Sequence, residues 1–76
     1  MKEKIIKILS ELRPEFDFSK PFNFIEDGML DSFDIINLVN AIESNFNVMI
    51  PGVEILPENF SSIDSIENLI KKSSKK

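Results

Sequence analysis

The feature that most constrains this chain is a stripe of apolar residues at helical spacing over residues 32–46. The stripe consists of Ile35, Leu38, Val39, Ile42 and Phe46. Side chains three and four positions apart lie on one face of an α-helix, so this spacing predicts an amphipathic helix. The apolar face of that helix must then be covered by the rest of a chain of only 76 residues.

The residues before this stripe predict how the helix begins. Asp31 is a good N-cap, and Asp34, three residues later, completes an acidic variant of the capping box. Ser32 is then the first helical residue, and capping does not require its hydroxyl. A helix N-terminus collects unpaired N–H groups and the positive end of the helix dipole, so it favours an anion such as a phosphate. In isolation the motif is weakly specific, because serine and aspartate are common at helix starts for capping alone.

Two further stretches have the helical period. The first covers about residues 2–13 and ends before Pro14, whose ring removes a backbone donor. Its stripe consists of Ile5, Ile8, Leu9 and Leu12. The second covers about residues 62–72 and follows a second predicted capping box, from Ser61 to Asp64. Its apolar face consists of Ile63, Ile66 and Ile70.

Between the second and third of these helices, residues 48–52 are expected to be extended. A proline at the first position of residues 57–61 favours a short helix there. The sequence thus predicts an all-α fold, a small four-helix bundle of three main helices and one short helix. We expect a single domain over residues 1–76, with a long loop at 14–31 and a tail at 73–76.

The long loop carries four phenylalanines at even spacing. Such spacing is typical of a strand, but two prolines and the lack of a partner stretch argue against a sheet. A loop of this length is uncommon unless it packs its own side chains. We therefore predict that the aromatic rings anchor the loop over the helices. They are Phe16, Phe18, Phe22 and Phe24.

The chain contains no cysteine and no histidine. This excludes disulfides, thiolate or imidazole metal sites, and nucleophiles activated by histidine. Paired carboxylates at Glu26/Asp27 and Asp31/Asp34 remain candidates for acid–base chemistry. Nothing in the sequence indicates a pocket around them, and a domain this small has little interior. We predict no catalytic residue and no enzymatic activity.

Residues 23–34 have the length of a calcium-binding loop, with Gly28 at the sixth position. In that alignment Ile25 occupies a ligand position, and Asp34 replaces the bidentate glutamate. The sequence therefore predicts no metal site.

The charges of the chain are segregated. All nine lysine and arginine residues lie at positions 2–20 or 71–76, whereas residues 21–70 contain acids and no base. Nucleic acid is not an expected partner, because neutralising phosphates needs a basic face. A partner with a positively charged surface is expected instead. One hypothesis is therefore an unmodified acidic interaction module, and acidity for solubility alone is another.

No feature indicates secretion or membrane insertion. The first nine residues mix acids and bases among their apolar positions, unlike a secretory leader. No apolar run approaches the roughly 20 residues that a membrane span needs. The basic face of residues 2–13 also contains acids, so core packing is favoured over lying on a membrane. We expect a cytoplasmic monomer.

Taken together, the elements resemble those of the acyl carrier protein family over essentially the whole chain. The resemblance rests on Asp27-Gly28-x-Leu30-Asp31-Ser32 at the end of the long loop. It continues with Ile50-Pro51, Pro57-Glu58-Asn59-Phe60 and Ser62-Ile63-Asp64-Ser65-Ile66. The Gly-x-x-Asp-Ser element is weakly specific alone, and its place at the start of the second helix makes it stronger.

The resemblance implies that a phosphopantetheinyl transferase attaches 4′-phosphopantetheine from coenzyme A to Ser32. The arm's thiol would hold an acyl or aminoacyl group as a thioester. Asp31 would shape the helix start and help to dock the transferase. Loading and transfer enzymes would dock through basic patches, and Phe33, next to the arm, would influence which partner binds. The acids expected to meet those patches are Asp34, Glu43, Glu54 and Glu58.

The chain departs from the family pattern in two places. Carriers of fatty-acid synthesis usually have leucine where this chain has Phe33, and their second helix is denser in acids than one with Asn37, Asn40 and Asn45. The chain is therefore closer to D-alanyl carriers of cell-wall modification and to specialised-pathway carriers of aminoacyl or polyketide units. The cargo is left open: the expected carrier holds an acyl or aminoacyl group, and an aminoacyl (D-alanyl-type) or specialised-pathway carrier is the alternative to a fatty-acid carrier. The short length, with no fused enzyme, favours a free-standing carrier.

Overall fold

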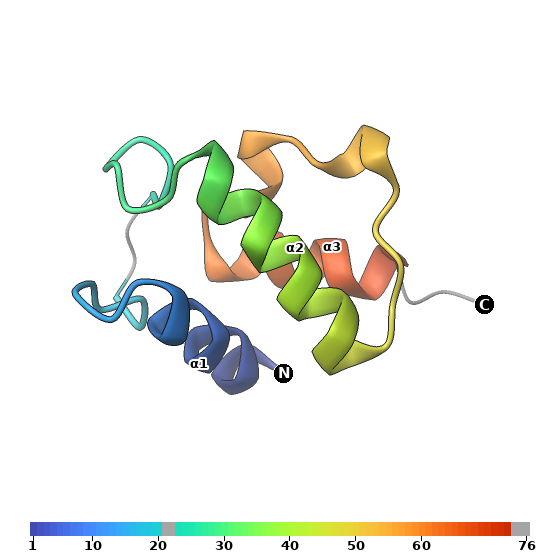
Figure 1. The fold of residues 1–76 in the computed structure, drawn as a ribbon, viewed down its shortest axis with the longest axis horizontal. Coiled ribbons are helices and arrows are strands. Elements are labelled where there is room, and N and C mark those ends of the chain that lie inside the picture. The colour runs from blue at the N-terminus through green and yellow to red at the C-terminus, as the bar shows by residue number, and fades with distance from the viewer. Residues whose placement is uncertain (21–22, 74–76) are drawn as a thin grey trace.

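Three α-helices form the framework of the computed structural model, which describes residues 1–20 and 23–73. Helix α1 spans Lys2–Leu12, α2 spans Ser32–Phe46 and α3 spans Ile63–Ser73 (Figure 1). Two short 3₁₀ helices, η1 at Gly52–Glu54 and η2 at Pro57–Phe60, lie between α2 and α3. The described part of the chain contains no strand, which confirms the predicted all-α fold. No helix in that part is long and apolar enough to cross a lipid bilayer.

The observed elements differ from the predicted ones in small ways. Residues 48–51, predicted to be extended, belong to no helix, but Gly52 begins η1, because the carbonyl of Pro51 accepts a hydrogen bond from Glu54 N–H at 2.9 Å and closes a turn. The short helix η2 ends at Phe60. Ser73, expected to open the tail, is the last residue of α3. The rest of the expected tail lies outside the described residues.

The start of α3 also differs from the prediction. The expected capping box joined Ser61 to Asp64, but the observed cap is Ser62, whose Oγ accepts a hydrogen bond from Ser65 N–H at 3.1 Å. Ser61 Oγ instead donates to the carbonyl of Glu58 at 3.1 Å. Either of two adjacent serines could cap α3. Because the Ser61 hydroxyl is engaged with Glu58 of η2, Ser62 is the cap.

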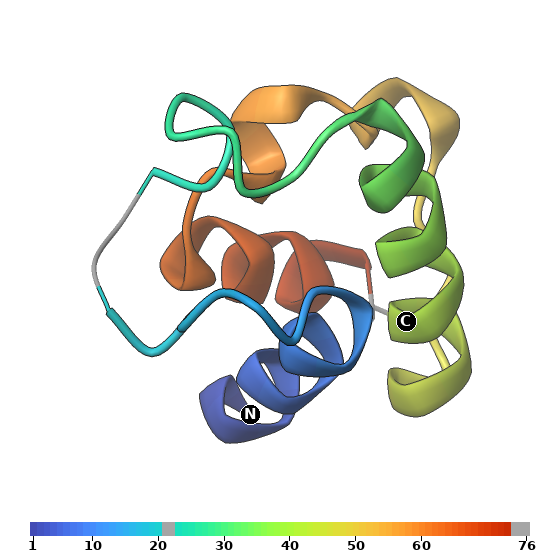
Figure 2. The same ribbon diagram turned by 60° about the vertical axis from the view of Figure 1, so that its left-hand side comes forward.

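Helices α1 and α2 run antiparallel (Figures 1 and 2). A cation of the α1 segment contacts each end of α2. Lys4 Nζ donates to the carbonyl of Asn45 at 3.3 Å and lies 5.2 Å from the centre of the Phe46 ring. At the other end, Arg13 Nη2 lies 2.8 Å from Asp34 Oδ2. A positive charge near a helix C-terminus is favourable for the helix dipole, so the Lys4 contact stabilises α2.

The core lies where the apolar faces of the three helices meet. Most residues of the predicted stripes are buried here, whereas Leu12, Phe46 and Ile63 are only partly buried at the edge of the core. Phe60 of η2 is fully buried among them. The largest fully buried side chains of the three helices are Ile5, Leu9, Leu38, Ile42, Ile66, Leu69 and Ile70. Burying a side chain of this size contributes about 1.5–3 kcal/mol, so these contacts are the main source of stability in a chain without disulfides.

The long loop before α2 is anchored by aromatic rings, as predicted. Phe18 and Phe24 are buried, and their rings meet edge to face with centres 5.1 Å apart. Phe16 is half-buried against the core and meets Phe18 at 6.2 Å. Phe22 lies outside the described residues. The loop thus contributes to the core as well as connecting α1 to α2.

Hydrogen bonds of Phe24 fix the last part of this loop. Phe24 N–H donates to the carbonyl of Ser61 at 2.8 Å, which ties the loop to the chain just before α3. The carbonyl of Phe24 accepts hydrogen bonds from the N–H groups of Met29 and Leu30 at 2.9 and 3.0 Å. The turn between them requires a φ of +73° at Gly28, a left-handed value that glycine adopts without strain. The chain is therefore held in place up to the residue before the cap of α2.

Candidate functional site

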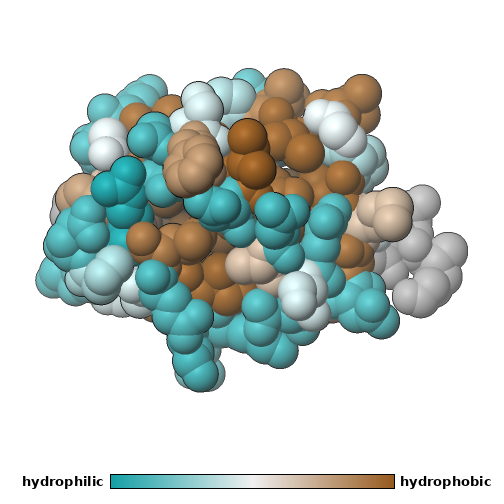
Figure 3. All heavy atoms as spheres, in the orientation of Figure 1, coloured by the Kyte–Doolittle hydropathy of each residue, from teal (hydrophilic) through white to brown (hydrophobic). Residues whose placement is uncertain are grey.

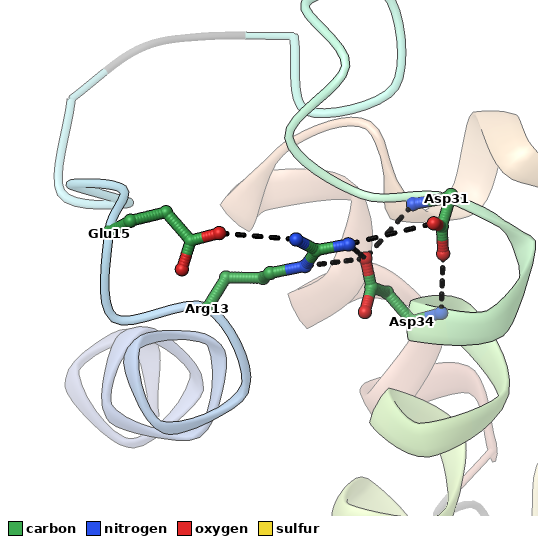
Figure 4. Close-up of polar contacts among 4 residues, drawn as sticks. All are labelled: Arg13, Glu15, Asp31 and Asp34. Atoms are coloured by element: carbon green, nitrogen blue, oxygen red, sulfur yellow. Dashed lines mark hydrogen bonds and ion pairs between the residues drawn. The ribbon is translucent and has the colours of Figure 1, made fainter.

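The start of α2 is a complete capping box, as the sequence predicts. Asp31 Oδ1 accepts a hydrogen bond from Asp34 N–H at 2.9 Å, and Asp34 Oδ2 accepts one from Asp31 N–H at 3.2 Å. Asp31 has the extended backbone of an N-cap, with φ −114° and ψ −175°. Both contacts are drawn in Figure 4. The box leaves the next residue free of any capping role.

That next residue is Ser32, the first residue of α2. It is exposed, and its hydroxyl forms no hydrogen bond with any residue that the structure describes. It sits at the N-terminal end of a helix of 15 residues. Unpaired N–H groups and the positive end of the helix dipole favour an anion at such a place. A hydroxyl there is accessible for modification, and the helix dipole taken alone would favour a phosphodiester attached to it.

Arg13, which follows α1, connects the capping box to the end of that helix (Figure 4). Its Nε donates to Asp34 Oδ2 at 2.9 Å, and its Nη2 lies 2.8 Å from the same oxygen and 3.5 Å from Asp31 Oδ2. Nη1 donates to Glu15 at 3.1 Å. Sequence analysis missed Arg13 as a site residue, because nothing in the local pattern links it to a carboxylate 21 residues away.

The carboxylate of Asp34 is kept ionised by these contacts. Its burial opposes the charge and by itself would raise the pKa. The hydrogen bonds from Arg13 and from Asp31 N–H, with the positive charge of Arg13, outweigh burial and hold the pKa of Asp34 below its ordinary value. The Asp34 side chain is only 9% exposed. The charge of Asp34 therefore stabilises the capping box and the contact with Arg13. Asp34 was expected among the docking acids, but its side chain is nearly buried.

The other three expected docking acids have different environments. Glu43 is half-buried, and its Oε2 accepts a hydrogen bond from Ile50 N–H at 2.9 Å, which fastens the chain after α2. Glu54 forms an ion pair with Lys72 at 3.2 Å. Glu58 is exposed, and no contact of its side chain is found among the described residues. Of this group, Glu58 is the acid best placed to meet a partner.

Apolar side chains are also exposed near Ser32. Phe33 is 72% exposed, and Ile36 follows one turn later at 57%. Figure 3 shows apolar atoms gathered over α2 and over the two 3₁₀ helices that follow it. This exposed apolar surface was not predicted from the sequence. The one signal for it was Ile36, an apolar residue that lies off the main stripe of α2. In the segment that follows α2, the large apolar residues that are exposed are Met49, Val53 and Leu56.

The space between α2 and α3 is filled by side chains. Leu38, Ile42 and Ile66 are fully buried, and Val39 and Ile50 are nearly so. A hollow of about 460 Å³ lies instead between α1, the long loop and the start of α3, and a smaller one lies beside η2. Neither of these two hollows is lined by a residue of α2, and so neither adjoins Ser32.

The chain is similar in sequence to several curated carrier proteins. No family model matches the chain. Among curated proteins, Aminoacyl carrier protein 1 of Bradyrhizobium diazoefficiens is 34% identical over 68 residues, which cover 88% of this chain and 74% of that protein. The D-alanyl carrier protein of Leuconostoc citreum is 32% identical over 76 residues, covering 92% and 96%. The acyl carrier protein of Buchnera aphidicola is 44% identical over 48 residues, covering 63% and 59%.

Two of these relatives match the chain at more than 30% identity over most of both sequences. The chain therefore belongs to the family of acyl, aminoacyl and D-alanyl carrier proteins, and its function is that of a carrier.

Proposed function

We propose that this chain carries an acyl or aminoacyl group as a thioester on a 4′-phosphopantetheine arm attached to Ser32 Oγ. A phosphopantetheine group is general to carrier proteins, and its terminal thiol supplies the thioester bond, which a chain without cysteine has no side chain to form. The observation that carries the proposal is the position of Ser32. Its hydroxyl is exposed at the first position of α2, beside a complete capping box that does not use it.

A phosphopantetheinyl transferase would attach the arm. In that reaction Ser32 Oγ forms a bond to the phosphorus that carries the pantetheine of coenzyme A. The bond from that phosphorus to the bridging oxygen breaks, adenosine 3′,5′-bisphosphate leaves with the electron pair, and the hydroxyl proton passes to a base of the transferase. Asp31 contributes by fixing the helix start, and the dipole of α2 favours the phosphodiester that results.

We propose that the chain is a substrate of enzymes and not itself an enzyme. Asp31 and Asp34, the pair of carboxylates nearest to Ser32, are already engaged in the capping box and with Arg13. General acid–base catalysis needs a group free to exchange a proton near neutral pH. The lowered pKa of Asp34 takes it further from that range. Carrier proteins are generally not catalytic, which supports the same view.

Partner enzymes would dock on the surface around Ser32. We propose that Phe33 and Ile36 form its apolar part and that Glu58 meets the basic patches of loading and transfer enzymes. Glu43 and Glu54 contribute charge from positions already tied to Ile50 and Lys72. We expect the chain to act as a monomer and to meet these enzymes in the cytoplasm.

We further propose that the cargo is a small aminoacyl group, with an acyl group as the alternative. The burial of Leu38, Ile42 and Ile66 supports this, and neither of the two hollows described above adjoins Ser32, where a long alkyl chain would begin. The aminoacyl and D-alanyl relatives also match the larger share of the chain.

An intact-mass measurement tests the attachment. The chain is incubated with coenzyme A and a promiscuous phosphopantetheinyl transferase, and Ser32→Ala and Ser44→Ala are treated alike. Ser44 is another exposed serine of α2 and controls for non-specific modification. We expect the chain and Ser44→Ala to gain one phosphopantetheinyl group and Ser32→Ala to gain none. A folded chain that gains no mass would contradict the proposal and would favour an unmodified acidic interaction module.

A further inference from the structure

The start of α2 contains more negative charge than an attachment site for an anion should favour. Asp31 and Asp34 flank Ser32 on both sides in the sequence, and both are needed for the capping box. A phosphodiester on Ser32 would add a third negative charge within one helical turn. At separations of a few ångströms, like charges cost about 1 kcal/mol in water and several times more where solvent is partly excluded. Something in the fold must offset this repulsion.

The side chain of Arg13 is placed to do so. It lies between the end of α1 and the capping box (Figure 4). Its Nε and Nη2 both contact Asp34 Oδ2, and Nη2 lies 3.5 Å from Asp31 Oδ2. Its side chain is about one-third exposed, so water screens this charge only in part. A planar guanidinium that contacts two carboxylates restrains their orientation as well as their charge.

We propose that Arg13 is a positioning residue for modification at Ser32. It holds Asp31 and Asp34 in the capping geometry that presents the Ser32 hydroxyl, and it offsets their charge where the phosphodiester forms. This inference rests on the proposed function and adds to it a residue outside both the attachment motif and α2. Arg13 touches no reacting atom, so its effect passes through the two aspartates.

The test compares the rate of phosphopantetheine attachment among folded variants, followed by intact mass at several concentrations of the carrier. Arg13→Gln removes the charge and the bidentate contact, whereas Arg13→Lys keeps the charge alone. Lys7→Gln is the charge-matched control, because Lys7 is an exposed residue of α1 and no ion pair of its side chain is found among the described residues. Ile66→Val is the stability-matched control, since Ile66 is fully buried in α3 and far in sequence from the box.

Arg13→Gln is expected to lower kcat/KM for attachment by about three- to tenfold, which is the scale of one misplaced charge-assisted hydrogen bond. The loss should fall on kcat, with KM nearly unchanged, because the exposed docking surface remains. Arg13→Lys should lie between Arg13→Gln and the unchanged chain. Lys7→Gln and Ile66→Val should be modified at the original rate.

Three results would overturn the inference alone: attachment to Arg13→Gln at the original rate, an equal loss in Lys7→Gln, or an equal loss in Ile66→Val. The first would show that Arg13 does not affect the site, the second that only net charge matters, and the third that only stability matters. Absence of any mass gain in the unchanged chain would instead contradict the proposed function itself.

Discussion

Arg13 and Asp34 are separated by 21 residues in the chain and joined at 2.9 Å between Nε and Oδ2. This contact fastens the end of α1 to the first turn of α2. The long loop between the two helices is therefore closed at its base by an ion pair and held at its tip by Phe24 and Ser61. The capping box of α2 is consequently a tertiary feature as well as a local one, and its geometry depends on α1.

The first prediction concerns acid stability. The pKa of Asp34 is lowered in the folded chain, so the unfolded chain binds its proton more readily, and stability falls as pH drops. The contribution is complete above the pKa of an unfolded aspartate, about 3.9, and is lost as pH falls through the lower folded value. The melting temperature should therefore fall more steeply between about pH 4 and pH 2 in the unchanged chain than in Asp34→Asn. Equal slopes in the two proteins would contradict this.

The second prediction concerns Gly28. Its φ of +73° is unfavourable for a residue with a Cβ, although an added Cβ would meet no atom within 4 Å. Gly28→Ala should therefore lower the free energy of unfolding by about 1–2 kcal/mol through backbone strain alone. Gly52→Ala is the matched control, because its site is equally open and has no positive φ. That change should be neutral or slightly stabilising. Urea denaturation measures both, and an equal effect of the two changes would rule out strain at Gly28.

The third prediction concerns Phe33. Because this side chain is 72% exposed, Phe33→Ala should leave the melting temperature nearly unchanged. It should raise KM for the phosphopantetheinyl transferase, since the ring adjoins Ser32 and offers apolar area to a partner. Met49→Ala, at an 80% exposed residue beyond the other end of α2, is the control and should leave KM unchanged. A similar KM for Phe33→Ala and the unchanged chain would remove Phe33 from the docking surface.

The fourth prediction concerns the cargo. The transferase can load acyl chains of increasing length from the matching coenzyme A thioesters, and the melting temperature of each loaded protein is then measured. If the bundle sheltered the chain, stability would rise by about 0.8 kcal/mol for each buried CH₂ group. Because the space beside Leu38 and Ile66 is filled, we expect no rise with length. A steady rise would show that the core opens for the cargo and would favour a fatty-acyl group.

Local signals in the sequence account for the helices and for the capping box that precedes Ser32. The box of Asp31 and Asp34 and the apolar stripe of α2 predicted that helix from Ser32 to Phe46, and the structure has the same bounds. At the other end Asn47 adopts the left-handed conformation, with φ 55° and ψ 48°, that ends a helix. These features depend on residues three or four positions apart, and for this reason a single sequence reveals them.

Features that depend on distant residues were not predictable in the same way. The burial of Asp34 follows from the approach of Arg13, and an acid at a helix start looks the same in the sequence whether it is exposed or paired. The choice of Ser62 over Ser61 as the cap of α3 depends on where η2 ends. The exposure of Ile36 and Met49 depends on how α2 and the turns after it pack against the rest of the chain, so the sequence alone did not predict it.

Because Ser32 occupies the first position of α2 and Asp31 occupies the cap, modification removes no hydrogen bond on which folding depends. Capping of the helix and the hydroxyl proposed for modification thus belong to two neighbouring residues, Asp31 and Ser32. Had the serine been the cap, attachment of the arm would have altered the oxygen that anchors the helix start. In the proposed function, cargo is loaded and released at the thiol of the arm, while the capping box of Asp31 and Asp34 stays the same.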